Sequence, residues 1–274
     1  MADGQGLLNA RFGMALPGVE VPDAIAPLLD RRVVRRYTDQ SVPDSLLDAL
    51  LAAAQSAPAK SDLQQYSVVV MRDAPRIKQI ADWIGTMDWI ATAPVFLVWC
   101  GDMRRGQRLC EMHEMPHANN NLDTFLNTAV DCSLAMGQFM AAAEAVGLGT
   151  CPISYVRSHI ERVSPLLGLP SGVYPVAGLT VVWPVFRRPV SMRLPPSIVV
   201  HRERYDDSRL DRDVADYDAR RRERDPVAPG GLKNNDVYKP REGVGWSENC
   251  ARQLSVPERF GFAAYLRTKG FDLA

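Results

Sequence analysis

Two stretches of sequence decide the fold: RRVVRRYTD at residues 31–39 and SAPAKSDLQQYSVVV at residues 56–70. The first places four arginines within six positions, shortly before a predicted helix. Guanidinium groups bind phosphate oxygens in pairs and stay charged at neutral pH. The second is a polar loop, punctuated by proline, that runs into a β-rich segment. Together they indicate a site for a nucleotide-like cofactor, although on spacing alone a solvated run of charge is the alternative for the arginines.

The composition is that of an ordinary globular chain. Its 274 residues are 46% hydrophobic and 23% charged, which suits one large domain with appended segments. Lysine plus arginine and aspartate plus glutamate both number 32, so the net charge is zero. No overall field therefore attracts nucleic acid or an anionic membrane, and any anion must be held by a local cluster. We expect neither nucleic acid nor a membrane as a partner.

Cysteine usage and the absence of long apolar runs predict a cytoplasmic protein without metal. Five cysteines, an odd number without a C-x-x-C pair, disfavour a disulfide framework and a zinc site. The N-terminus lacks the apolar run of a signal peptide. The longest apolar stretch, 125–146, is interrupted by Asp131 and Glu144, so no uncharged run within it reaches the ~18 residues of a membrane span. His113 and His117 lie in a polar segment without H-E-x-x-H, so no metal is expected.

Hydrophobic periodicity predicts helices interleaved with short strands. Helices are expected over 42–55, 73–84, 123–146 and 159–167, and strands over 65–71, 94–100, 150–153 and 176–182. The segment 102–122 is polar and poorly periodic, which indicates a surface excursion or a lid. After residue 205 the chain is densely charged, then loop-like over 226–244, then helical in pattern over 246–270. Such a tail indicates an arm that reaches over the body or a partner chain.

The motifs resemble the FMN-dependent nitroreductase family, whose usual text is an Arg-Arg-Ser-x-Arg-x-Phe start and an Ala-Pro-Ser-x-x-Asn-x-Gln-Pro-Trp loop. The likeness continues in order through APVFLVWCGD, AAAEAVGLGTCPI, PVAGLTVVWP and RLPPSIVVHRERY. The C-terminal WSENCARQ and ERFGFAAYLRTKGF are similar to the larger NADPH-dependent nitroreductase and flavin reductase subgroup. Each motif is degenerate, but their shared order makes chance agreement small.

The resemblance implies an α+β fold, with a central mostly antiparallel sheet flanked by helices and a C-terminal arm exchanged in a homodimer. The expected parts are an N-terminal extension (1–20), an FMN-binding core (21–215) and a C-terminal loop and arm (216–274). The implied activity is that of an NAD(P)H oxidoreductase that reduces nitro-aromatic, quinone or flavin acceptors by ping-pong hydride transfer. The flavin N5 carries the hydride, so no side chain is expected to act as nucleophile or base.

The resemblance also implies a site, residue by residue. The expected phosphate clamp comprises Arg31, Arg32, Arg35 and Arg193. The ring is expected beside Pro58, Ala59, Lys60, Ser61 and Asp62, and beside Pro152, Ile153 and Ser154. The positions near substrate and nicotinamide are Ser61, Arg157 and Arg259. NADPH is expected over NADH as the reductant, with its 2′-phosphate within reach of Lys233, Lys239 and Arg241.

Three substitutions set the chain apart from the family pattern. Val33 replaces a phosphate-binding serine and removes a hydroxyl, and Ser191 replaces a lysine and removes a charge. Asp62 replaces an asparagine and puts a carboxylate near the ring, with Lys60 as its expected partner. These three changes leave open the alternative of a flavin-binding protein without turnover.

Ser154 and Tyr155 stand where the larger subgroup often has two glycines. Together with the segment 102–122 and the loop 226–244 they leave open a second alternative, a flavin enzyme for a specific metabolite such as an enone, an N-heterocycle or a halogenated aromatic.

Overall fold

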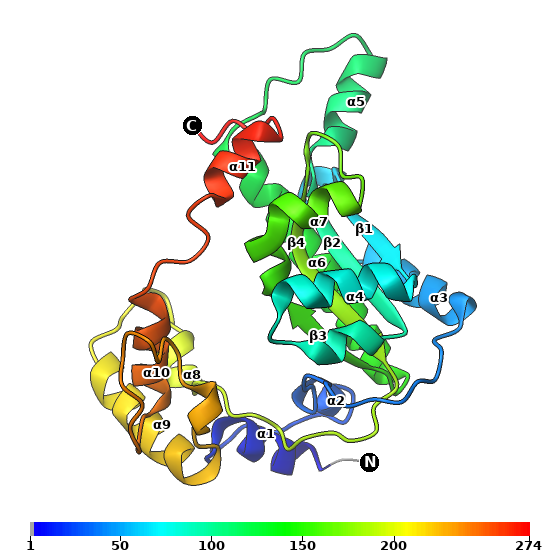
Figure 1. Ribbon diagram of the computed structural model, residues 1–274. Helices are drawn as coiled ribbons and strands as arrows, with labels where there is room; N and C mark the ends of the chain where they lie inside the picture. Colours follow the sequence, from blue (N-terminus) through cyan, green and yellow to red (C-terminus); the bar gives the residue numbers. More distant parts are fainter. Residues whose placement is uncertain (1–2) are drawn as a thin grey trace. The chain divides into compact units, whose positions relative to one another are not determined.

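The computed structural model describes residues 3–274, which fall into two compact units that are treated separately below. The first unit combines the chain up to Arg31 with Pro189–Glu258, and the second combines Arg32–Arg188 with Arg259–Ala274. Figure 1 shows the order of the elements along the chain. The boundaries of these units differ from the division into 1–20, 21–215 and 216–274 that the sequence analysis gives. That division stays a prediction. The first two residues of the predicted extension 1–20 lie outside the described residues.

An antiparallel sheet forms the centre of the second unit (Figure 1). Within residues 3–274 it has four strands in the order β1-β2-β4-β3, and every neighbouring pair is antiparallel. The strands are β1 (Tyr66–Met71), β2 (Val95–Asp102), β3 (Gly149–Ile153) and β4 (Val173–Val182). The expected strands are therefore confirmed, and β4 begins three residues earlier than the predicted 176.

Helices cover both faces of this sheet. On one face lie α3 (Asp44–Gln55) and α6 (Leu122–Ala145), which pack in one core cluster with Trp99 of β2. On the other face lies α4 (Ala74–Ile84), which Figure 1 shows crossing in front of the sheet and which packs with Phe96. Because successive side chains of a strand point to opposite faces, β2 is buried along its whole length. Its sequence VFLVWC therefore reads as a continuous apolar run.

Shorter elements complete the second unit. They are η1 (Lys60–Asp62), η2 (Asp88–Thr92), α5 (Arg104–Met112), η3 (Ser154–His159), α7 (Ile160–Leu166) and α11 (Phe262–Thr268). Helix α5 occupies the segment that periodicity predicted to be an irregular surface excursion. None of the residues described in α5 is buried. Because the helix has no face in the core, its sequence lacks the regular apolar spacing by which core helices are predicted.

The first unit is helical. Its elements are α1 (Gly4–Phe12), α2 (Ala26–Leu29), α8 (Pro196–Val199), α9 (Leu210–Arg224), η4 (Pro229–Gly231) and α10 (Trp246–Leu254). The densely charged stretch forms α9, and the predicted helical tail over 246–270 consists of two helices, α10 and α11. Across residues 3–274, no helix has both the length and the apolar character that crossing a bilayer requires.

Candidate functional site

The arginine segment (residues 32–37) runs beside the edge strand β3 in an extended conformation. Val33 forms a parallel bridge with Thr150 of β3, and the Val34 N–H donates to the Thr150 carbonyl at 3.0 Å. The lack of a side chain at Gly149 makes room for this approach, since a Cβ there would lie 2.4 Å from Val34 Cγ2. The backbone therefore fixes the path of the segment, and its arginine side chains are left for other contacts.

Further arginines gather beside this segment. Arg32 Nη1 donates to the Arg188 carbonyl at 2.8 Å, and Arg187 Nη2 donates to the Leu148 carbonyl at 3.3 Å. Burial lowers the pKa of Arg32; the positive charge of Arg187 lowers it further, while Glu144 raises it. The sequence interpretation missed Arg187 and Arg188, although an Arg-Arg-Pro triplet separated from the end of a strand by four residues was a visible signal.

Two residues of the expected phosphate clamp, Arg31 and Arg193, belong to the first unit. The buried side chain of Arg11 donates to the carbonyls of Leu29 and Arg31, at 2.6 Å and 2.7 Å, and to that of Ser191 at 2.9 Å. The Arg193 N–H donates to the Arg11 carbonyl at 2.7 Å. Arg11 thus joins the two chain segments that carry these predicted residues, and nothing in its sequence context had indicated such a role.

The polar loop (residues 58–65) leads into β1. Ser61, Asp62 and Gln64 have positive φ angles of 49°, 57° and 50°, a left-handed conformation that residues with a Cβ adopt at a cost. Asp62 Oδ1 accepts from Gln64 Nε2 at 3.0 Å, while Lys60 Nζ lies 4.0 Å from Asp123 Oδ2. The predicted pairing of Lys60 with Asp62 is therefore wrong, because the left-handed turn directs the two side chains to different partners.

The polar loop is flanked by two hollows. One, of about 480 Å³, is lined by residues of α3 and β1 together with Asp62 and Gln64. The other, of about 370 Å³, is lined by Lys60, by residues of α5 and α6, and by His117. Both hollows are lined only by residues of the second unit. Residues on either side of the loop can therefore be reached by a small molecule.

Pro152, Ile153 and Ser154 lie at the opposite edge of the sheet. Proline suits β3 because an edge strand has one side on which no backbone N–H is needed. The start of β1 is level with Tyr174 of β4, whereas the end of β3 pairs with Gly178, four residues further along β4. Across the sheet they are also separated by three strand spacings, which amount to roughly 14 Å. The two segments expected to contact one ring are thus held at opposite edges of one sheet.

Two of the three residues predicted near substrate and nicotinamide, Arg157 and Arg259, come together at the end of β3 with Ser154, which was predicted to contact the ring. Arg259 Nε donates to Ser158 Oγ at 3.1 Å, and Arg259 Nη2 lies 3.5 Å from Ser154 Oγ. Arg157 donates to the carbonyl of Val176. Burial is the main cause that lowers the pKa of Arg157, followed by the positive charge of Arg259. The structure therefore brings Ser154, Arg157 and Arg259 into one cationic group, whereas Ser61 lies in the polar loop at the other edge.

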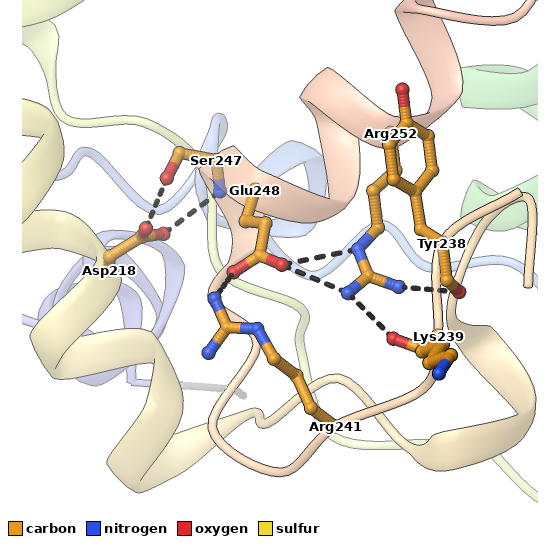
Figure 2. A network of polar contacts seen from close by, with 7 residues as sticks. All are labelled: Asp218, Tyr238, Lys239, Arg241, Ser247, Glu248 and Arg252. Atoms are coloured by element: carbon orange, nitrogen blue, oxygen red, sulfur yellow. Dashed lines mark hydrogen bonds and ion pairs between the residues drawn. The ribbon is translucent and has the colours of Figure 1, made fainter.

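In the first unit, the long loop before α10 is bonded to that helix. Figure 2 shows Glu248 between two arginines: one oxygen binds Arg241, and the other accepts from Arg252 Nη2 at 3.0 Å. The buried Arg252 also donates to the carbonyls of Tyr238 and Lys239, at 3.4 Å and 3.2 Å. Arg241 is therefore engaged by a carboxylate, whereas the side chain of Lys239 is exposed.

The donor chemistry of the second unit fits a phosphate joined to a planar ring. Arg32 is partly buried and Arg35 is exposed, so both guanidinium groups can be reached. Burial raises the pKa of Cys100 to about 12 and that of Cys132 well above its ordinary value, which makes both thiols poor nucleophiles. Among residues 3–274, no group of three or more His, Cys, Asp and Glu side chains is placed to hold a metal ion.

The chain belongs to the nitroreductase family. The model of that family matches residues 28–182, and the model of the nitroreductase C-terminal domain matches residues 191–274. The resemblance drawn from the motifs is therefore confirmed over both parts of the chain.

Individual relatives carry the likeness over most of their own length. An FMN reductase (NAD(P)H) of Bacillus subtilis is 40% identical over 185 residues, which are 67% of this chain and 74% of that protein. An oxygen-insensitive NADPH nitroreductase of Salmonella typhimurium is 30% identical over 251 residues, or 89% of this chain and 96% of that protein. The structure of B. megaterium NfrA2 has a TM-score of 0.84 at 31% identity and covers 93% of this chain and 100% of its own. The α+β, nitroreductase-like fold is thereby confirmed.

Proposed function

We propose that this chain is an FMN-dependent NAD(P)H oxidoreductase that reduces small nitro-aromatic, quinone or flavin acceptors. The observation that carries the proposal is the group of arginines fixed beside β3, next to Pro152–Ser154, in a chain of this family. Bound FMN supplies a ring that takes up hydride and releases it to an acceptor. The chain's own task is then to bind and orient that ring, which fits a site without a nucleophile or a general base. A reducing, cytoplasmic location is part of the same proposal.

The proposal assigns the site residues to three parts of the ligands: the FMN phosphate, the flavin ring and the nicotinamide substrate. Arg32 and Arg35 bind the phosphate, because guanidinium groups pair with phosphate oxygens. The polar loop and Pro152–Ser154 contact the ring, and Arg157 and Arg259 attract the anionic parts of the nicotinamide substrate. Arg31 and Arg193 stay predictions for the phosphate.

Titration of the purified protein with FMN tests the proposal directly. Binding should bring the flavin absorbance with the protein through gel filtration, and NADPH should bleach it under anaerobic conditions within a catalytic turnover. A colourless protein that gains no flavin absorbance would overturn the proposal. A protein that binds FMN but is not bleached by NADPH or NADH would leave only flavin binding without turnover.

We further propose that the enzyme is a homodimer. The two segments expected at the ring lie at opposite edges of one sheet, so a ring that meets both is better served by segments from two copies. Helix α6 also exposes four large apolar side chains at intervals of four residues, a spacing that puts them on one face. They are Leu122, Leu126, Val130 and Leu134, with exposed fractions of 52%, 55%, 45% and 43%.

Leu126→Glu should break this homodimer, because a charge would be buried against an apolar partner face. We expect the mass in sedimentation velocity to fall from that of two chains to that of one, with bound FMN lost in parallel. Leu28→Glu is the matched control, since Leu28 is 59% exposed on α2, outside both α6 and the C-terminal arm. A dimer that survives the Leu126 substitution would contradict the role of this face.

NADPH is the proposed reductant. Lys233 and Lys239 have exposed side chains in the loop before α10, where they can meet a 2′-phosphate. Arg241 is the weaker candidate, since its guanidinium is bonded to Glu248 (Figure 2). Steady-state kinetics with both nucleotides measure the preference, and a clear preference for NADH would count against both lysines.

A second candidate function keeps the flavin and restricts the acceptor to one metabolite. It is favoured by Ser154, whose hydroxyl oxygen lies 3.5 Å from Arg259 Nη2 and places a polar group at the end of β3. A screen of enones, N-heterocycles, halogenated aromatics, nitro compounds and quinones would decide between the two. If generic nitro compounds and quinones are reduced as fast as any of the metabolites, this candidate loses its support.

A further inference from the structure

The polar loop is held from beneath by one buried carboxylate. Asp131 of α6 is 2% exposed, and each of its oxygens accepts a backbone N–H of the loop. Oδ1 accepts from Lys60 at 3.0 Å and Oδ2 accepts from Gln65 at 3.1 Å. These two donors lie on either side of the left-handed residues, so a single side chain bonds both ends of the turn.

A guanidinium group holds the carbonyls at the end of the same loop. Arg105 of α5 donates through Nη1 to the Gln64 carbonyl, and through Nη2 to the Tyr66 carbonyl at 3.1 Å and to Ser67 Oγ at 3.0 Å. Asp102 orients this arginine: its Oδ1 accepts the Arg105 N–H at 3.0 Å, and its Oδ2 accepts from Ser67 Oγ at 2.5 Å. The loop is thus bonded through its N–H groups to α6 and through its carbonyls to α5.

The conformation of the loop requires such bonds. Three residues with side chains adopt positive φ angles, and the side chains of residues 60–64 are exposed, so no apolar burial holds the turn. Backbone in a sparsely populated region persists where the surroundings over-determine it. Here those surroundings are chiefly the side chains of Asp131 and Arg105.

We propose that Asp131 is a positioning residue for the flavin ring, with Arg105 as its counterpart on the opposite side of the loop. Neither side chain needs to touch the flavin, because each acts through the backbone of the polar loop. The proposal rests on the proposed function, which puts this loop at the ring. Nothing in the family motifs assigns either residue.

Asp131→Asn is a suitable variant because it keeps the shape of the side chain and removes one acceptor. An amide group has one acceptor oxygen, and its NH₂ would face a backbone N–H. At most one of the two loop bonds can then survive. Asp123→Asn is the matched control: Asp123 lies on the same helix and meets the side chain of Lys60, but bonds no backbone atom of the loop.

Hydrogen exchange measured on the protein without flavin tests the loop itself. In Asp131→Asn the amides of Lys60 and Gln65 should exchange about 10- to 100-fold faster, as expected when a backbone donor loses a charged acceptor. Asp123→Asn should leave both rates unchanged. Unaltered exchange at both amides in Asp131→Asn would overturn the proposal.

Flavin binding then tests the positioning role. Arg105→Met serves as the second variant, because this side chain is half exposed and its loss is compatible with folding. Both variants should weaken FMN binding by roughly 10-fold, the effect of one lost charged hydrogen bond, and change the visible circular dichroism of the bound flavin. Faster loop exchange with an unchanged flavin affinity and spectrum would overturn the proposal while leaving the proposed function intact. A wild-type protein that binds no FMN would overturn both.

Discussion

The arginine segment and the polar loop are fixed by opposite means. The arginine segment is bonded to β3 through its own backbone, and side chains within it, such as that of Arg32, add further contacts. The polar loop is bonded through side chains that belong to α5 and α6. The backbone bonds of the first region do not depend on which side chains its exposed residues carry, whereas we expect the second region to change shape when Asp131 or Arg105 is replaced.

Removal of two arginines from the arginine segment should have the largest effect. In Arg32→Ala with Arg35→Ala, the loss of two charged hydrogen bonds of ~1.5–3 kcal/mol each should raise the Kd for FMN by about 10²- to 10⁴-fold. Fluorescence titration of FMN measures it. Arg108→Ala, on α5, is the control and should change the Kd little, because this exposed arginine is paired with Glu111. An equal loss in Arg108→Ala would show that net charge alone decides FMN binding.

Gly149→Ala should disturb the path of the arginine segment. The new Cβ would meet Val34 Cγ2 at 2.4 Å, so one of the two backbones has to move. We expect the free energy of unfolding to fall by about 1–3 kcal/mol, the usual cost of overpacking. Urea denaturation measures this change. Gly261→Ala is the control, because a Cβ there meets open space, and it should stay close to wild type.

Val33→Ser should restore a hydroxyl donor to the arginine segment. Because Val33 is held by a backbone bridge, the exchange should leave the path intact and lower the Kd for FMN by up to about 10-fold, the worth of one hydrogen bond. Val33→Ala removes the same methyl groups without adding a hydroxyl and serves as the control. If both variants bind FMN equally, the hydroxyl at position 33 forms no hydrogen bond to the FMN phosphate.

Asp62→Asn should have the smallest effect, on the redox potential of bound FMN. Removing a negative charge near the ring stabilises the anionic reduced flavin by about 1 kcal/mol, which raises a two-electron potential by on the order of 20 mV. Dye-linked anaerobic titration measures the potential, with Asp48→Asn on α3 as the control. A potential that falls or stays fixed would remove Asp62 from the vicinity of the ring.

The contrast between the two regions also explains what the sequence could and could not predict. Periodicity predicted all four strands and the helices that cover the sheet, because these elements bury apolar faces. The motifs identified the arginines and the polar loop because both are short and local. The partners of the polar loop could not be predicted in this way: Gln65 and Asp131 are 66 positions apart in the sequence.

Asp131 was nevertheless noticeable in the sequence, as a charged residue within the apolar stretch 125–146. A carboxylate within an apolar helix has to find hydrogen-bond donors, and that requirement marks a buried polar contact. The sequence does not say which donors it finds. Arg105 left no comparable trace, because an arginine on an exposed helix is ordinary. Arg11 was also missed, since its three carbonyl acceptors come from separate segments of the chain.

Helix α6 carries both features on consecutive residues. Val130 belongs to its exposed apolar face, and Asp131 bonds the polar loop. Neighbouring residues of a helix are separated by about 100° around its axis, so a rotation of α6 moves both at once. In the proposed homodimer, a mutation that rotates α6 to tighten or loosen the association of two copies would also shift the polar loop, so association and flavin binding would be coupled.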